Sequence, residues 1–328
     1  MKNIATWKLI KSCLDNGIAV MLLYVLESSG SSPGRQGFFM AVNAKGNMEG
    51  SIGGGIMEHK FVEMAKKRLK GQGDKGQEIR KQLHDKSAAK NQSGMICSGE
   101  QTILLYRVQE SDSATIQNII TSLEQNKNGT LHLFSSGINF STTVPEKDFH
   151  FAMRSEEDWE YAEKTGYKNQ LFIIGGGHCA LAFSKLMRSM GFYIRVYDDR
   201  PELKTMQENQ FAHECQEIHD FSSLKDIILS GKNHYVVIMT FGYRSDDLTV
   251  RALVNKEFKY IGLLGSKTKI KKMLDKYRNE GINPAWLQRI HAPVGLDIKS
   301  QTPEEIAVSI AAEIIQIKNQ PPLPDLSA

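Results

Sequence analysis

The sequence is 328 residues long, and 41% of its residues are hydrophobic and 24% are charged. This composition is typical of a globular protein and excludes a largely disordered chain, and the length predicts two domains. The net charge of +4, from 41 Lys and Arg against 37 Asp and Glu, predicts no nucleic-acid partner but suits an anionic ligand. No apolar run is long enough to cross a bilayer, so we expect no membrane partner.

The first elements alternate between helix and strand. Apolar residues at helical spacing over 4–14 predict a helix, and apolar runs over 19–27 and 38–42 predict strands. The loop between these strands, 28–37, is rich in Gly, Ser and Pro and carries Arg35. It suits an anion contact, and it equally suits a solvated hairpin loop.

A glycine turn precedes the next helix. Gly53, Gly54 and Gly55 lead into an amphipathic pattern over 56–69. Because the N–H groups at the start of a helix are unpaired and attract anions, these glycines are candidate cofactor-binding residues.

The number and spacing of the cysteines indicate the cellular compartment and the chemistry open to their thiols. The four cysteines show no C-x-x-C spacing, which favours a cytoplasmic protein with neither a disulfide framework nor a metal-ion site. Cys97 stands at a junction before an alternating strand over 102–108. A thiol there can be a soft ligand, so Cys97 is a candidate catalytic and cofactor-binding residue; the alternative is a small buried hydrophobe.

An acidic run over 155–163 interrupts the pattern of elements. We therefore predict an N-terminal domain over 1–154, a linker or bridging helix over 155–168, and a C-terminal domain over 169–328.

The clearest local pattern opens the second domain. An apolar run over 171–174 leads into Gly175, Gly176 and Gly177, followed by a helical pattern and a second apolar run that ends at Asp198. The spacing G-x-G-x-x-A predicts a strand–turn–helix–strand unit of the dinucleotide-binding type. A turn that serves only close packing is the alternative.

Polar residues flank this unit at its ligand-facing end. His178 follows the turn at the start of the helix, and Asp198 and Asp199 end the second strand. A carboxylate at that position can accept hydrogen bonds from a ribose diol. All three residues are candidate cofactor-binding residues.

Further strands over 214–219, 235–239 and 260–264 predict a Rossmann-like, doubly wound parallel sheet. Ligands bind at the carboxyl ends of such strands, so the loops that follow should contribute as well. These loops add four candidate cofactor-binding residues: Thr240, Gly242, Gly265 and Ser266.

The end of the chain departs from a plain nucleotide fold. His291 lies in a loop with a proline, a glycine and an aspartate, where it is a candidate catalytic residue that suits an acid/base, an anion contact or a turn-closing hydrogen bond. Thr302, Pro303 and Glu305 predict a capped helix over 303–318.

Taken together, these stretches resemble the XdhC/CoxI family of maturation proteins for xanthine dehydrogenase-type hydroxylases. The resemblance rests on SSGSSPGRQG, GSIGGGIMEHKF, MICSG, FIIGGGHCALAFSKLMRSMGFYIRVYDDRPE, TFGYRSDDLTVRALV, YIGLLGSKTK and RIHAPVGLDIKSQTPEEIAVSIAAEII. It implies an N-terminal α/β domain of the XdhC/CoxI type, a C-terminal Rossmann-like domain and a homodimer. It also implies a chaperone that holds the molybdenum cofactor (molybdopterin), assists its sulfuration with a sulfur donor, and delivers it to a hydroxylase.

Two departures from the family pattern concern thiols. Ile56 stands where many relatives have cysteine after the glycine turn, and Cys97 is followed by Ser98 rather than glycine. The resemblance therefore makes Cys97 the one thiol at a family position. Two other functions stay open: an NAD(P)-dependent oxidoreductase that uses the glycine turn, and a non-catalytic interaction protein that docks through the lysine-rich helix around 267–276.

Overall fold

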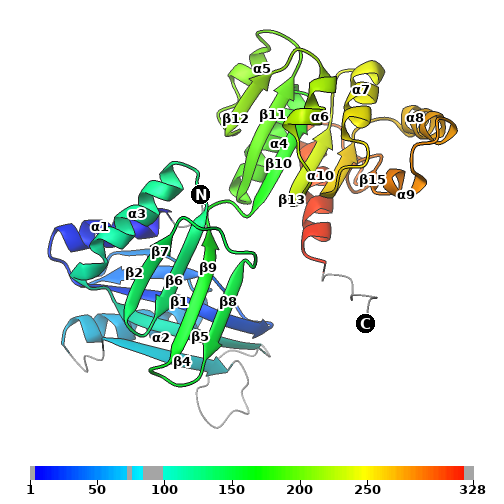
Figure 1. Cartoon of the computed structure of the whole chain (residues 1–328). Coiled ribbons are helices and arrows are strands. Elements are labelled where there is room, and N and C mark those ends of the chain that lie inside the picture. The colour runs from blue at the N-terminus through cyan, green and yellow to red at the C-terminus, as the bar shows by residue number, and fades with distance from the viewer. Residues whose placement is uncertain (1–3, 72–75, 84–98, 321–328) are drawn as a thin grey trace. The chain divides into compact units, whose positions relative to one another are not determined.

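The computed structural model describes residues 4–71, 76–83 and 99–320. The chain divides into two compact units, residues 1–166 and 167–328, which Figure 1 colours from blue to green and from green to red. Cys97 lies outside the described residues.

The first unit contains two antiparallel sheets and three helices among its described residues. One sheet, ordered β3-β2-β1-β5-β4, comprises β1 (Val20–Gly30), β2 (Phe39–Asn43), β3 (Met48–Gly50), β4 (Gln77–Leu83) and β5 (Gly99–Arg107). The other, ordered β7-β6-β9-β8, comprises β6 (Gly129–Phe134), β7 (Gly137–Ser141), β8 (Phe149–Met153) and β9 (Trp159–Thr165). The helices are α1 (Ile4–Asp15), α2 (Gly55–Leu69) and α3 (Ser113–Glu124), with a 3-10 turn η1 (Glu110–Asp112).

Strand β1 is the centre of the first unit because it is buried on both faces. Leu22 and Tyr24 face a core shared with α1, α3 and the second sheet. Leu23 and Val25, which point the other way, face a core closed by α2. Successive side chains of a strand alternate between faces, so an unbroken apolar run is the pattern of a strand covered on both sides.

The segment predicted as a linker or bridging helix, 155–168, is different in the structure. Trp159–Thr165 forms β9, paired with β6 and β8. Trp159 and Tyr161 are 4% and 0% exposed, whereas Glu160 between them is exposed, which is the two-residue period of a strand. In the sequence this alternation is obscured by the acidic residues that surround Trp159 and Tyr161.

A carboxylate ties β9 to the first sheet. Glu163 Oε2 accepts hydrogen bonds from the hydroxyl groups of Tyr24 (2.5 Å) and Tyr161 (2.9 Å). Burial, followed by the charge of Glu163, raises the pKa of both tyrosines. Both hydroxyl groups therefore stay protonated as donors, and the two sheets are joined by a polar contact inside an apolar core.

The second unit is a six-stranded parallel sheet in the order β12-β11-β10-β13-β14-β15. Its strands are β10 (Asn169–Ile174), β11 (Phe192–Asp198), β12 (Glu214–Glu217), β13 (Gly231–Ile238), β14 (Phe258–Leu263) and β15 (Ile290–His291). Its helices are α4 (His178–Ser189), α5 (Lys204–Gln207), α6 (Leu224–Ile227), α7 (Tyr243–Leu253), α8 (Lys267–Asn279), α9 (Pro284–Leu287) and α10 (Pro303–Lys318), with a 3-10 turn η2 (Phe221–Ser223). The predicted doubly wound α/β fold is confirmed.

Helices cover both faces of this sheet. Side chains of α4 and α10 share one core with the sheet, and those of α7 and α8 share the other; Figure 1 shows α4 and α10 behind the strands and α7 on the near side. Helix α10 begins as predicted, because Thr302 and Glu305 form a reciprocal capping box around Pro303. None of the helices in the described residues is long and apolar enough to cross a membrane.

The strand order places a topological switch between β10 and β13. From β10 the chain proceeds to β11 and β12 on one side of the sheet, and then returns to β13, β14 and β15 on the other. Loops at the carboxyl ends of the two central strands diverge at such a point and leave a crevice in which ligands of doubly wound folds bind.

Candidate functional site

The glycine turn after β10 forms one wall of this crevice. Gly175 has φ of +106°, and a Cβ built on it would lie 2.4 Å from the Met239 carbonyl oxygen and 2.8 Å from the Thr240 amide nitrogen. A residue with a side chain would meet backbone that cannot move away cheaply. The loops after β10 and β13 therefore touch each other at the base of the crevice.

Gly176 is held by a carboxylate from the neighbouring strand. Its N–H donates to Asp198 Oδ2 at 2.7 Å, and its carbonyl accepts from the Thr205 hydroxyl at 2.5 Å. A Cβ on Gly176 would lie 2.4 Å from the Met206 side chain. This glycine is therefore enclosed by protein and serves the turn itself.

The carboxylate of Asp198 is fully engaged. Besides Gly176, it accepts three hydrogen bonds from Arg200: from the backbone N–H (3.0 Å), from Nε (2.8 Å) and from Nη2 (2.8 Å). Burial would raise the pKa of Asp198, but the bonds from Arg200 and Gly176 outweigh it and lower the pKa. Two donors on each oxygen use the acceptor sites of a carboxylate, so a ribose diol could bind Asp198 only by displacing Arg200. The side chain of the next residue, Asp199, is exposed.

Gly177 is the open part of the turn. It is the N-cap of α4, no atom of the described residues outside its chain neighbours would lie within 4 Å of a Cβ built on it, and no side chain of the described chain caps this helix. The first turn of α4, which begins at His178, contains no acidic residue. The N–H groups at the start of a helix lack intrahelical partners and favour an anion.

The thiol in the same helical turn is not activated. Burial, with a smaller contribution from the charge of Glu304, raises the pKa of Cys179. A raised pKa means less thiolate at neutral pH, so Cys179 is a poor nucleophile and a poor soft ligand.

The loop after β13 uses its polar groups internally. The Thr240 hydroxyl donates to Asp246 Oδ1 at 2.6 Å, and the other oxygen of Asp246 forms an ion pair with Lys269. Asp246 is 0% exposed, and burial raises its pKa although Lys269 and Thr240 oppose the shift. Gly242, the N-cap of α7, would have open space around a Cβ among the described residues. Thr240 thus organises the loop, and Gly242 borders solvent.

The loop after β14 starts α8. Ser266 is the N-cap of this helix, and its hydroxyl accepts from the Lys269 N–H at 3.3 Å. A Cβ on Gly265 would lie 3.3 Å from the Lys269 side chain. Since β13 lies between β10 and β14, this loop is two strand spacings, roughly 10 Å, from the glycine turn.

His291 belongs to a separate cluster. Its Nδ1 lies 3.3 Å from Glu313 Oε1, and its ring stacks on Tyr260 with centroids 4.8 Å apart. Glu313 Oε2 also accepts from the Tyr260 hydroxyl (2.5 Å) and from the Gly295 N–H (2.8 Å). His291 lies in β15, three strand spacings or roughly 14 Å from β10. His291 thus contacts a carboxylate of α10 rather than a group of its own loop.

The glycine turn of the first unit is closed by an acid of its own helix. Glu58 Oε2 accepts from the N–H groups of Ile52 (2.9 Å) and Gly54 (3.0 Å) and from the Ser51 hydroxyl (2.7 Å). A Cβ on Gly53 would lie 2.4 Å from the Gly34 amide nitrogen. The prediction that Gly53, Gly54 and Gly55 cradle an anion therefore needs Glu58 to move, because its carboxylate already takes that place.

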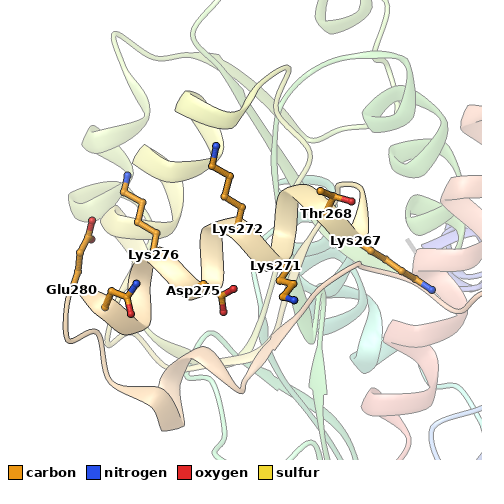
Figure 2. A pocket seen from close by; sticks show the side chains of 8 residues that line it. Lys267, Thr268, Lys271, Lys272, Asp275, Lys276 and Glu280 are labelled. Carbon is orange, nitrogen blue, oxygen red and sulfur yellow. The ribbon is translucent and has the colours of Figure 1, made fainter.

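The lysine-rich helix carries a shallow surface hollow. Its lining residues are Lys267, Thr268, Lys271, Lys272, Asp275, Lys276, Asn279 and Glu280. Figure 2 shows Lys271 and Asp275 on one side of the helix and Lys272 and Lys276 on the other, so these side chains do not converge on a common point. Within the part of the chain that the structure describes, no group of three or more His, Cys, Asp or Glu could hold a metal ion.

One residue at the crevice has no counterpart in the sequence-based predictions. Phe241, in the loop after β13, is 90% exposed, and the Arg200 guanidinium lies over its ring, 5.9 Å from the centroid. An aromatic residue between the end of an apolar strand and a glycine is the signal that could have identified it.

Comparisons with known proteins identify relatives for both units. A family model described as the XdhC Rossmann domain matches residues 171–314, and one described as the XdhC and CoxI family matches residues 13–79. A protein of Bacillus subtilis named as a probable xanthine dehydrogenase component is 31% identical over 164 residues, which is 49% of this chain and 46% of that protein. An uncharacterized protein, YqeB, of Escherichia coli is 25% identical over 303 residues, which is 91% of this chain and 43% of that protein.

The chain spans less than half the length of both curated relatives. A crystal structure from Bacillus halodurans, named as a xanthine dehydrogenase, is similar with a TM-score of 0.70 and 24% sequence identity, and the match covers 99% of this chain and 98% of that one. This similarity extends over both units and supports the fold.

Proposed function

Because the chain belongs to the XdhC and CoxI family, we propose that it is an accessory protein of a xanthine dehydrogenase-type molybdenum hydroxylase. It holds the molybdenum cofactor, assists its sulfuration, and delivers it to the hydroxylase. The observation that carries the proposal is the match of the XdhC Rossmann domain over residues 171–314, a range that contains the open turn at Gly177. The similarity to a B. subtilis protein named for xanthine dehydrogenase supports the choice of partner.

The open turn fits the phosphate of this cargo. The cofactor's pterin ends in a phosphate, and the turn at Gly177 combines unpaired N–H groups at the start of α4 with free space and no acidic residue in the first helical turn. The first unit does not offer the same fit, because Glu58 fills its turn. We therefore assign phosphate binding to the second unit.

Sulfuration, the sulfur donor and the homodimer rest on the family alone. Cys97 is the family-placed thiol in this sequence, and we propose it as the group that approaches the metal-bearing end of the cofactor. Cys97→Ser should then stop activation of the hydroxylase with little loss of thermal stability. Normal activation by this variant would remove Cys97 from the proposal.

A nicotinamide-dependent oxidoreductase is the second candidate, and one observation favours it. The sheet order with a glycine turn beside the switch point is the arrangement of dinucleotide-binding folds. The engaged carboxylate of Asp198 opposes it, since the acid that would bind the ribose already accepts four hydrogen bonds.

A titration and an activation assay separate these functions. The purified chain is titrated calorimetrically with isolated molybdenum cofactor, NADH and NADPH, and is then mixed with cofactor and an apo-hydroxylase. We expect binding of molybdenum cofactor and activation that depends on the chain. Tight NADH or NADPH binding with turnover would instead establish the oxidoreductase, and binding of none of the three would leave an interaction protein.

A further inference from the structure

Phe241 places an aromatic ring in solvent at the mouth of the crevice. Its 90% exposure is the highest among the exposed large hydrophobic side chains of the described residues. Burial of apolar surface stabilises a fold, so a globular protein gains nothing from an aromatic ring held out in water unless something covers it. The ring follows β13, the strand on one side of the switch point, where ligands of this fold class bind.

Arg200 is held in position beside this ring. Three hydrogen bonds from Arg200 to Asp198 fix both its backbone and its guanidinium. The guanidinium lies 5.9 Å from the centroid of Phe241. Asp198 itself is 1% exposed and cannot swing away. The planar cation is thus held in one orientation beside Phe241. It therefore loses little conformational entropy when a second planar group stacks on it.

The ring and the cation are connected to the glycine turn by direct contacts. Asp198, which holds Arg200, also accepts the N–H of Gly176. The residue before Phe241 touches Gly175, since the Thr240 amide would lie 2.8 Å from a Cβ there. The start of α4, the Phe241 ring and the Arg200 guanidinium are therefore linked through residues that touch one another at the carboxyl ends of β10, β11 and β13.

We propose that Phe241 and Arg200 form a stacking platform for the planar nitrogen heterocycle of a phosphate-bearing ligand. Two ligands share this chemistry, a pterin phosphate and a purine nucleotide, and the assignment to a pterin rests on the proposed function. Aromatic faces and guanidinium planes both stack on such heterocycles, and both are present here at the switch point that also holds the glycine turn. Phe241 supplies the apolar face, and Arg200 supplies the charge that favours an electron-rich ring.

The test compares probes with and without a ring. AMP and isolated molybdenum cofactor carry a heterocycle and a phosphate, whereas ribose 5-phosphate carries the phosphate alone. Phe241→Ala should weaken the binding of whichever ring-bearing probe the wild-type chain binds by roughly 5- to 150-fold in Kd. The Kd for ribose 5-phosphate should be unchanged. Phe241→Trp keeps an aromatic ring at this position and should therefore retain the binding of AMP or molybdenum cofactor that Phe241→Ala loses.

Leu229→Ala is the matched control. Leu229 is also an exposed apolar residue, at 65%. It lies just before the amino end of β13, whereas Phe241 follows the carboxyl end of this strand. The Leu229→Ala substitution should leave the affinities for AMP, molybdenum cofactor and ribose 5-phosphate unchanged. The platform is overturned if Phe241→Ala binds AMP and molybdenum cofactor as tightly as the wild type does. It is also overturned if the substitution weakens the binding of ribose 5-phosphate as much as it weakens the binding of the ring-bearing probes.

The two proposals fail separately. If the wild-type chain binds AMP through Phe241 but does not bind molybdenum cofactor, the platform stands and the proposed function falls. If it binds molybdenum cofactor and Phe241→Ala retains that affinity, the proposed function stands and the platform falls. Binding of neither ring-bearing probe overturns both.

Discussion

The two glycine turns have similar sequences and opposite capacities for a ligand. Each leads into a helix, and in each a glycine N–H donates to a carboxylate of the chain. In the first unit that carboxylate, Glu58, is part of the helix that follows, so it lies across the turn where an anion would bind. In the second unit the carboxylate, Asp198, comes from the neighbouring strand, so it holds Gly176 from the side and leaves Gly177 open.

This difference shows what a glycine pattern can and cannot predict. Glycines allow the positive φ angles and the close backbone contacts that a turn requires. Whether the N–H groups of that turn are available to a ligand depends on the nearest internal acceptor. Four substitutions test this distinction, and the largest effect is expected in the open turn.

Gly177→Val should abolish phosphate-dependent ligand binding, with at least about a 100-fold rise in Kd, because a branched side chain would occupy the space the phosphate needs. The fold should survive, since Gly177 has φ of −71° and the described residues leave room for a side chain. Calorimetric titration with molybdenum cofactor measures the loss, and thermal unfolding checks the fold. Unchanged affinity would show that the turn at Gly177 is purely structural.

Gly53→Ala should lower the stability of the fold, whereas Gly177→Val should lower only ligand affinity. This residue has φ of +125°, and the new Cβ would lie 2.4 Å from the Gly34 amide nitrogen, so we expect about 3 kcal/mol of destabilisation. Urea unfolding of the purified variant measures it. A variant as stable as the wild type would contradict the closed packing of the first turn.

Asp198→Asn should destabilise the second unit by about 1–2 kcal/mol at pH 7, a value discounted from that of a buried pair because Arg200 is partly exposed. The pKa of Asp198 is lowered in the folded protein. Its contribution is therefore present above the unfolded value of about 4, and it is lost as pH falls through the lower folded value.

The pH dependence provides the control for this variant. Urea unfolding at pH 7 should separate wild type from Asp198→Asn, and the gap should shrink as pH falls below about 4. A gap that is independent of pH would mean that the loss comes from altered packing rather than from the carboxylate.

Glu58→Ala should have the smallest effect on stability, about 1 kcal/mol, because the N–H groups of Ile52 and Gly54 lose their acceptor at a site that water can reach. It should also open the first turn. Inorganic phosphate should then raise the melting temperature of the variant more than that of the wild type. An equal response of the two proteins would show that Glu58 does not block an anion site.

Local signals in the sequence predicted much of the fold. The capping pattern at Thr302 and Glu305 located the start of α10 because both partners lie within one helical turn. The apolar run at 19–27 predicted β1 because burial on both faces requires it. Strand β9 was missed because its alternation involves only Trp159 and Tyr161 amid acidic residues, and β15 was missed because a two-residue strand depends on its neighbour β14.

The site was less predictable because it depends on contacts between distant residues. The sequence predicted that Asp198 ends the second strand of the unit, which is β11. No sequence pattern predicts that the Arg200 guanidinium donates hydrogen bonds to the Asp198 carboxylate. Glu58 is an acid in the first turn of α2, a position where an acid complements the helix dipole, so its presence in the sequence does not by itself point to the glycine turn. The exposure of Phe241 is likewise a property of the folded chain.

The contact of Gly175 with Met239 and Thr240 has a kinetic consequence. Backbone meets backbone there, so the loops on the two sides of the crevice cannot close further, and the width of its base is set before any ligand arrives. A preformed crevice needs no rearrangement during association. In a stopped-flow experiment the observed binding rate should therefore rise linearly with ligand concentration, without the plateau that a slow closing step would impose.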